Sequence, residues 1–189
     1  MAYAKVEHDV VIDKLMEVFR SSGYDGASMA TLAEATQLKK ASLYHRFPQG
    51  KEEMAHAVLR YVATWAKSKI ADVLVVSDST PEDRLDTALK AIDELYDGGR
   101  LDCILRALSH GSAANLFQIE IGAIFETLIR SFKHLALEFD HNEQQAQQLA
   151  HELMVKIQGT LIVQRSLGQP SMFKAMLAEM RAKFMKTHF

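Results

Sequence analysis

The chain has 189 residues, of which 48% are hydrophobic and 24% are charged, with a formal net charge of −2 and a single cysteine. This composition is that of an ordinary folded protein, so it excludes disorder, collagen and a coiled-coil rod as descriptions of the whole chain. One cysteine can neither form an intramolecular disulfide nor supply a cysteine-based zinc site.

The N-terminus lacks the basic start and the apolar run of a secretory signal. No apolar stretch approaches the roughly 18 residues that mark a candidate membrane span. We therefore expect a cytoplasmic protein with no membrane partner.

Apolar residues recur three or four positions apart along almost the whole chain, which is the spacing of amphipathic helices. Sustained alternation of apolar and polar residues, which would predict a sheet, is absent from the sequence. Glycine, proline and capping residues divide the pattern into about nine helices, so the predicted fold class is all-α. The expected helices are a first one that ends at Gly23, followed by 28–36, 40–47, 51–75, 81–98, 100–109, 113–138, 143–167 and 171–186.

The positive charge is concentrated in one short window. From Gln37 to Lys51 the chain carries Lys39, Lys40, Arg46 and Lys51 and no acidic residue. On a mildly acidic protein, this basic patch indicates a small anion-binding surface rather than a general coat for nucleic acid.

Two short expected helices, 28–36 and 40–47, are separated by a break of about three residues. This pattern is typical of a helix-turn-helix, whose second helix can enter the major groove of DNA. Leu43 and Phe47 lie four residues apart and are expected to anchor the second helix to the core. The opposite face of that helix then presents small or hydrogen-bonding side chains, namely Lys40, Ala41, Ser42, Tyr44, His45 and Arg46.

The start of the second helix favours DNA binding over a purely structural role. Lys39 and Lys40 lie at its N-terminus, where a cation opposes the helix dipole by about 0.3–1 kcal/mol. Lys39 also occupies the position at which serine, aspartate or asparagine would cap the helix. Phosphate groups bound at this helix end would remove the conflict.

The segment resembles the TetR family of bacterial transcriptional regulators. The similarity covers about residues 8–60 and is carried by Thr31-Leu32-Ala33, Leu38, Ala41-Ser42-Leu43-Tyr44, Phe47 and Lys51. The extra Gly50 before Lys51 is similar to a subgroup that includes the LmrA/YxaF-type repressors. The chain departs from the family at Gln37, where a turn glycine is usual, at Lys39, where serine is usual, and at Arg46, where histidine is common.

The resemblance implies a set of DNA-binding residues. Tyr44 and Lys51 would contact phosphates with help from the end of the first short helix, because such contacts position the protein. Base edges in the major groove would be read by Lys40, Ala41, Ser42 and His45 on the second helix. The full expected set is Ser28, Thr31, Lys39, Lys40, Ala41, Ser42, Tyr44, His45 and Lys51.

The resemblance also implies two domains, a helix-turn-helix DNA-binding domain at 1–50 and an effector-binding and dimerisation domain at 51–189. The implied function is that of a ligand-responsive regulator, a repressor released from a pseudo-palindromic operator in double-stranded DNA by a small, largely apolar effector. No cofactor or metal is implied. Side chains of these kinds more often belong to the plain core or the surface, and the residues that could instead line the effector pocket are Tyr61, Trp65, Tyr96, Cys103, His110, Phe117 and Phe125.

A homodimer is expected because a single helix-turn-helix offers too little surface for selective binding. The last two helices, 143–167 and 171–186, carry apolar stripes that could form a four-helix bundle with a second subunit. The alternative is that both stripes pack inside the monomer. The residues expected in the seam are Ala146, Leu149, Leu153, Ile157, Leu161, Met172, Met176 and Met180.

Two other classes of function compete with this interpretation. An enzyme is disfavoured because the sequence has no GxSxG elbow, glycine-rich phosphate loop, HExxH or cysteine–histidine dyad. An all-α adaptor without sequence-specific DNA binding is the remaining alternative. An adaptor should not prefer one short pseudo-palindrome over bulk DNA, whereas a regulator should.

Overall fold

The structure of the chain, a computed structural model, describes residues 7–76 and 78–186. Within these ranges every regular element is helical and no strand occurs, which confirms the predicted all-α fold. The described residues form nine helices when α4, η1 and α5 are counted as one continuous helix, together with the short 3₁₀ turn η2. None of these helices is long and apolar enough to cross a membrane.

The chain divides into two compact units. Unit 1 comprises the described residues up to Val62 together with Ile104–Ile121, and unit 2 comprises Ala63–Cys103 and the residues from Gly122 onward. A single boundary at residue 50 does not describe this division, because a segment from the middle of the chain belongs with the N-terminal helices.

Unit 1 is built on α1 (His8–Gly26), α2 (Met29–Thr36), α3 (Lys40–Arg46) and the start of α4 (Lys51–Ala66). Helix α1 continues past Gly23, where the sequence predicted its end, after a break in helical geometry at that glycine (φ 68°). The core of the unit is formed by side chains at most 3% exposed: Val11, Ile12, Leu15, Phe19, Leu32, Leu43, Phe47, Met54 and Val58.

The two short helices begin and end as their sequences predict. The Ser28 hydroxyl accepts a hydrogen bond from the Thr31 N–H at 3.1 Å, and the Thr31 hydroxyl accepts one from the Ser28 N–H at 3.0 Å. This reciprocal pair satisfies two backbone donors at the start of α2. At its end, Gln37 adopts the left-handed conformation (φ 55°, ψ 27°), which costs a non-glycine residue about 1–2 kcal/mol.

A second segment completes unit 1 with α7 (Ile104–Ala107), η2 (Gly111–Ala113) and the start of α8 (Gln118–Glu138). The predicted helix over 100–109 was therefore too long, because Asp97, Gly98 and Gly99 all have positive φ and turn the chain before it. Helix α8 begins five residues later than predicted, since residues 114–117 form a turn.

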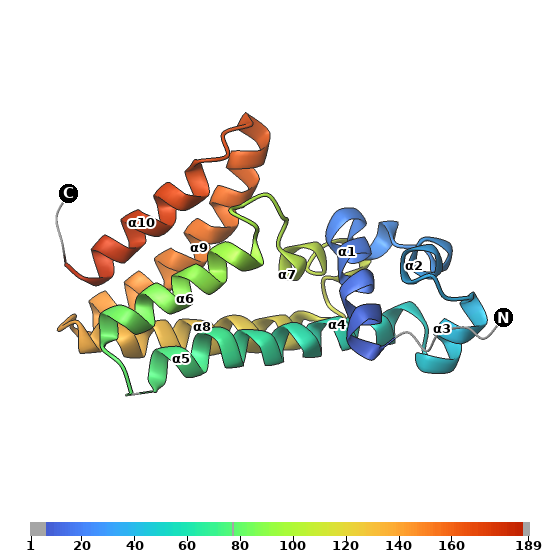
Figure 1. Cartoon of the computed structure of the whole chain (residues 1–189), viewed down its shortest axis with the longest axis horizontal. Helices are drawn as coiled ribbons and strands as arrows, with labels where there is room; N and C mark the ends of the chain where they lie inside the picture. The colour runs from blue at the N-terminus through green and yellow to red at the C-terminus, as the bar shows by residue number, and fades with distance from the viewer. Residues whose placement is uncertain (1–6, 77, 187–189) are drawn as a thin grey trace. The chain divides into compact units, whose positions relative to one another are not determined.

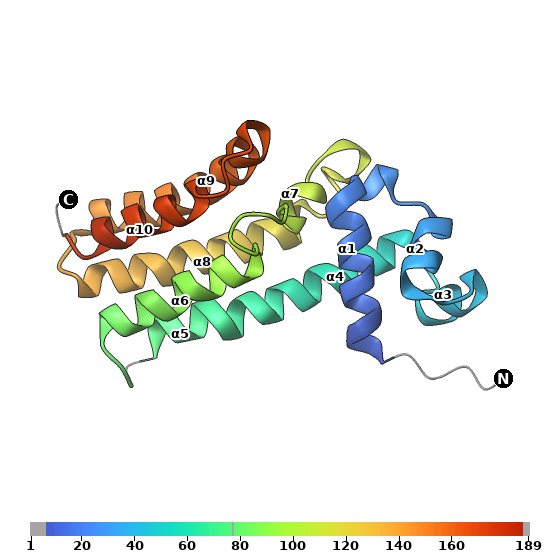
Figure 2. The same cartoon turned by 45° about the horizontal axis from the view of Figure 1, so that its top comes forward.

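Unit 2 contains the end of the long helix predicted over 51–75, which passes from α4 through the π-helical η1 (Lys67–Ala71) into α5 (Asp72–Val75). It also contains α6 (Pro81–Leu95), most of α8, α9 (Glu143–Leu167) and α10 (Met172–Phe184). Helices α9 and α10 lie side by side and run in opposite directions (Figures 1 and 2).

The apolar stripes of α9 and α10 pack mostly inside the subunit, which corrects the expected dimer seam. Helix α10 packs on both α9 and α6, so the stripes are covered by the chain's own helices. Leu149 and Met172 remain partly exposed. The other six expected residues are at most 6% exposed, namely Ala146, Leu153, Ile157, Leu161, Met176 and Met180.

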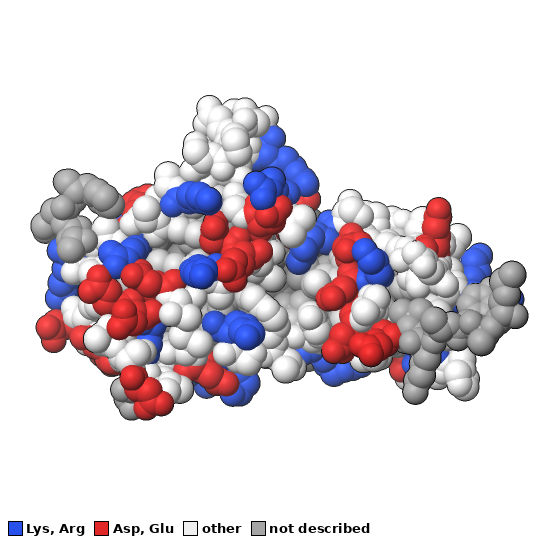
Figure 3. Space-filling model, in the orientation of Figure 1, with Lys and Arg blue, Asp and Glu red and all other residues white. Residues whose placement is uncertain are grey.

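Ion pairs join the helices of unit 2. Arg181 on α10 pairs with Asp86 at 2.5 Å and with Glu82 at 2.7 Å, both on α6. Arg84, whose side chain is only 4% exposed, pairs with Glu138 at the end of α8. On the face of this unit seen in Figure 3, acidic and basic side chains are interleaved rather than gathered into patches of one sign.

Candidate nucleic-acid interface

Helix α3 presents a polar face to solvent. Its core side is fixed by Leu43, which is completely buried, and by Phe47 immediately after the helix, which is 3% exposed. The predicted DNA-reading side chains on the other side are all exposed, namely Lys40, Ala41, Ser42, Tyr44 and His45. The arrangement gives one short helix with a small, hydrogen-bonding outer surface, as the sequence predicted.

The N-terminus of α3 is not capped by a side chain. Lys39 occupies the N-cap position, and its side chain makes no capping hydrogen bond. The first turn contains no acidic residue, and its Lys40 is exposed. Free N–H groups at a helix end, reinforced by two ammonium groups, suit an anion such as a phosphate.

Tyr44 is supported by the glycine that follows the helix. A Cβ atom placed on Gly50 would lie 3.3 Å from the Tyr44 ring, and Gly50 has a φ of 70° that favours glycine. The ring is 48% exposed, so its hydroxyl remains available to a partner. The glycine that the sequence marks as an extra residue thus makes room for this aromatic ring.

Lys51 has an internal partner that the sequence did not predict. Its ammonium donates a hydrogen bond to the main-chain oxygen of Tyr24 at 2.8 Å and lies 4.2 Å from the centre of the Tyr24 ring. Its expected role as a phosphate contact stays a prediction, and one of its three donors also holds the end of α1. Ser28 and Thr31 likewise bond to each other across the start of α2.

Sequence reasoning missed a contact between the end of α1 and the turn before α8. The Asp25 carboxylate accepts hydrogen bonds from the Ser112 hydroxyl and from the Ser112 N–H, the latter at 3.0 Å. These bonds, the hydroxyl's first, hold the pKa of the Asp25 carboxyl below its ordinary value. No local motif could have revealed the pair, because 87 residues separate its members.

The same region contains an aromatic cluster. The Phe117 ring lies edge-on to the Tyr24 ring at 5.3 Å and to the His56 ring at 4.9 Å. His56 Nδ1 lies 2.7 Å from a carboxylate oxygen of Glu120 on α8. Burial of the Tyr24 hydroxyl raises its pKa. Phe117 is thus part of the core of unit 1, which is the alternative to a pocket position that the sequence left open for it.

Of the other expected pocket residues, the structure brings Tyr96 and Cys103 into contact. Tyr61 and His110 belong to unit 1, and His110 is exposed, with its Nδ1 3.0 Å from the Ser109 hydroxyl. In unit 2, the Tyr96 hydroxyl donates to the buried Cys103 sulfur at 3.4 Å. Trp65 and Phe125 are half-buried in that unit. Among the described residues, no group of three His, Cys, Asp or Glu side chains could hold a metal ion.

Comparison with known proteins bears on the same segment. Residues 11–58 match the model of the family described as bacterial regulatory proteins, tetR family. This N-terminal segment is similar to the DNA-binding region of TetR-family regulators. The match contains the whole helix-turn-helix, from the capped start of α2 to the N-terminal half of α4.

Two relatives are transcriptional repressors by name. The chain is 26% identical over 149 residues to the HTH-type transcriptional repressor DhaR of Mycobacterium sp. (strain GP1), over 76% of this chain and 72% of DhaR. It is 41% identical over 61 residues to the HTH-type transcriptional repressor ComR of Escherichia coli (strain K12), over 32% of this chain and 29% of ComR.

Solved structures share the fold over almost the whole chain. A TetR transcriptional regulator from Legionella pneumophila superposes with a TM-score of 0.79 at 18% identity, over 95% of this chain and 97% of that one. A cysteine mutant of the TetR-family regulator CifR, complexed with 26-bp double-strand operator DNA, gives a TM-score of 0.71 at 20% identity, over 97% and 98%. The helices outside the family match are therefore also arranged as in TetR-like proteins.

Proposed function

We propose that this regulator is a repressor that binds a pseudo-palindromic operator as a homodimer and is released by a small, largely apolar effector. The observation that carries the proposal is the exposed polar face of α3 beside an uncapped, basic helix N-terminus. The names of DhaR and ComR support repression rather than activation.

The proposed DNA contacts follow from exposure and chemistry. Lys39 neutralises phosphates at the start of α3, and the Tyr44 hydroxyl donates to a neighbouring phosphate. Lys40, which the sequence assigned to a base edge, is the first residue of α3 and is proposed as a phosphate contact instead. Ala41, Ser42 and His45 face the base edges, where small residues allow close approach and donors read the pattern. Lys51 contributes through the two N–H donors that Tyr24 leaves unused, and Ser28 and Thr31 assist through the start of α2.

The proposed dimer uses a different face of α9 from the one that the sequence suggested. Val155 is 71% exposed and Ile162 is 48% exposed. They flank Gly159, where an added Cβ would meet nothing within 4 Å. A glycine inside a helix lowers stability by about 0.5–1 kcal/mol relative to alanine. Close approach of a second helix at this point would explain why glycine occupies it. Leu167, 59% exposed, extends the face.

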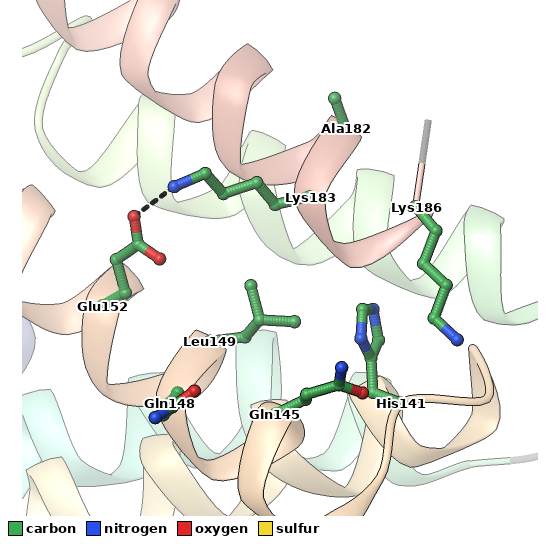
Figure 4. Close-up of a pocket in the computed structure, with 8 residues that line it drawn as sticks. All are labelled: His141, Gln145, Gln148, Leu149, Glu152, Ala182, Lys183 and Lys186. Atoms are coloured by element: carbon green, nitrogen blue, oxygen red, sulfur yellow. Dashed lines mark hydrogen bonds and ion pairs between the residues drawn. The ribbon is translucent and has the colours of Figure 1, made fainter. Parts of the chain in front are cut away.

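The surroundings of this face support the same partner. Figure 3 shows few charged groups on the tip formed by the end of α9 and the turn that leads to α10. At the other end of α9, a groove of about 470 Å³ opens between α9 and α10. Figure 4 shows Leu149 between Gln145 and the Lys183–Glu152 ion pair in this groove. We propose that helices of the second subunit cover both.

The proposed effector site lies in unit 2. Trp65 and Phe125 are half-buried there, which leaves aromatic surface for an apolar molecule. The proposed division of roles is the one that the sequence suggested. Residues 1–50, together with Lys51 at the boundary, bind DNA, and residues 51–189 supply effector binding and dimerisation. The placement of Gly50 beneath Tyr44 supports the LmrA/YxaF-like subgroup.

Selection of bound duplexes from a random double-stranded DNA library tests the proposal. A dimeric repressor should enrich one inverted repeat, and its affinity for that repeat should exceed its affinity for unrelated DNA by about 10³-fold or more. An all-α adaptor would enrich no sequence, and that result would reject the proposal.

Because Trp65 is the only tryptophan in the chain, its fluorescence can report the binding of candidate apolar effectors.

A further inference from the structure

Unit 1 depends on a segment that is remote in the sequence. Helix α1 packs against both α7 and η2, although about 80 residues separate them. The chain passes between the two units at three places: inside α4 after Val62, before α7 after Cys103, and inside α8 after Ile121. Two of these passages lie inside the continuous helices α4 and α8. A contact that holds the start of α8 to α1 therefore also constrains the DNA-binding helices of unit 1.

The Asp25–Ser112 contact joins the end of α1 to the turn before α8. The carboxylate of Asp25 accepts from both the hydroxyl and the N–H of Ser112. Gly111 precedes this serine with a φ of 63°, and a Cβ atom on it would collide with the Asp25 carboxylate. The close approach therefore requires glycine at position 111, for both its conformation and its lack of a side chain.

Two further contacts surround the pair. Phe117 packs edge-on against Tyr24, the residue before Asp25. Glu120, in the first turn of α8, reaches His56 on α4. The end of α1 and the first half of α4 thus hold the turn and the first residues of α8 at three separate points.

We propose that Asp25 and Ser112 are positioning residues for DNA binding. They fix the distance between the two recognition helices, which are the α3 helices of the two subunits, and hence the preferred spacing of operator half-sites. The inference rests on the dimeric operator binding proposed above. Helix α8 has 21 residues, so it is about 30 Å long. A rotation of about 10° at one end moves the other by about 5 Å, which exceeds the 3.4 Å rise of one base pair.

The test compares spacing preference in the full-length protein and its variants. The probe is the inverted repeat selected by the wild-type protein, with the spacer between half-sites lengthened or shortened by one and two base pairs. We expect altered spacing to weaken wild-type binding by about tenfold or more. In Asp25→Ala, Ser112→Ala and Gly111→Ala this penalty should shrink to about threefold or less, while affinity for a single half-site stays within about twofold.

Ser109→Ala is the matched control, because the Ser109 hydroxyl bonds within its own turn to the Arg106 oxygen at 2.9 Å. This variant should keep the full spacing penalty. The double variant Asp25→Ala/Ser112→Ala should behave like Asp25→Ala alone, because loss of the carboxylate already removes both hydrogen bonds, whereas Ser112→Ala keeps the one from the main-chain N–H. Ser112→Ala deletes a single oxygen atom, so it tests the inference even where a larger change unfolds the protein.

Two outcomes would overturn the inference, and they differ. If the wild type discriminates spacings and Ser112→Ala discriminates them equally, the contact does not position the recognition helices. If the wild type binds all spacings equally well, dimeric binding to a spaced repeat is itself wrong, and the inference fails with the proposed function.

Discussion

The Lys51 ammonium lies 2.8 Å from the main-chain oxygen of Tyr24 and 4.2 Å from the centre of the Tyr24 ring. Lys51 is the first residue of α4, so this contact binds the start of α4 to the end of α1. Because a charge-assisted hydrogen bond and a cation–π contact act together here, this lysine stabilises unit 1.

We therefore expect Lys51→Ala to lower the free energy of unfolding by about 1–3 kcal/mol, since both contacts are lost. Urea denaturation followed by circular dichroism measures the change. Lys40→Ala serves as the control, because this exposed lysine opposes the helix dipole and its loss should leave stability unchanged or slightly raised. Equal stability of the two variants would show that the contact with Tyr24 contributes nothing.

Lys40→Ala should instead act on DNA binding. Loss of one phosphate contact is expected to flatten the plot of log affinity against log salt concentration by about 0.9. Fluorescence anisotropy with the selected duplex between low and moderate salt measures the slope. Lys90→Ala, at an exposed position on α6, should leave the slope unchanged.

Tyr44→Phe should weaken binding to all sequences about equally, because a phosphate contact carries no sequence information.

Gln37→Gly should stabilise the protein. Gln37 has a φ of 55°, and glycine adopts this conformation without the steric cost of a Cβ atom. Its side chain is exposed, so little packing is lost, and we expect a gain of about 0.5–1 kcal/mol after the greater flexibility of glycine in the unfolded chain is subtracted. Thermal unfolding checks this, and Gln169→Gly, at an exposed position in the turn after α9, provides a comparison without that gain.

If the proposed dimer forms through this face, Val155→Glu or Ile162→Glu should yield folded monomers, because each places a charge on the exposed face of α9. Sedimentation at micromolar concentration and circular dichroism report assembly and folding separately. Leu153→Glu should unfold the chain instead, since Leu153 is completely buried. Ala123→Glu, exposed on α8, is the neutral control. A Val155→Glu protein that stays dimeric would remove this face from the interface.

The buried guanidinium of Arg84 makes Glu138 important for stability. The hydrogen bond from Arg84 holds the pKa of the Glu138 carboxyl below its ordinary value. The stabilisation is therefore present above the ordinary glutamate pKa and is lost as the pH falls through the lowered pKa of the folded state. Glu138→Gln should cost about 1–3 kcal/mol at neutral pH, because the guanidinium loses its charged partner.

A pH series of urea midpoints should show this difference shrinking in acid. Glu94→Gln is the matched control. Glu94 pairs with Lys90 at 3.8 Å on an exposed helix face, and such pairs contribute about 0.5 kcal/mol or less. A Glu138→Gln variant as stable as the wild type at neutral pH would show that Arg84 needs no charged partner.

The sequence by itself determined the helices and the recognition surface. Helical spacing, the Ser28 cap and the glycine breaks are local signals, because helix hydrogen bonds and caps join residues at most four apart. For the same reason, the exposed face of α3 could be predicted from the positions of Leu43 and Phe47 alone.

The tertiary structure alone decided what distant helices bury. It assigned 104–121 to the DNA-binding unit through Asp25 and Ser112, gave Lys51 an internal partner, and placed Leu153 and Met180 inside the subunit rather than on its surface. An apolar stripe reports only that one side of a helix is covered. Whether the cover comes from the same chain or from a second subunit depends on how the helices pack, which sequence periodicity does not encode.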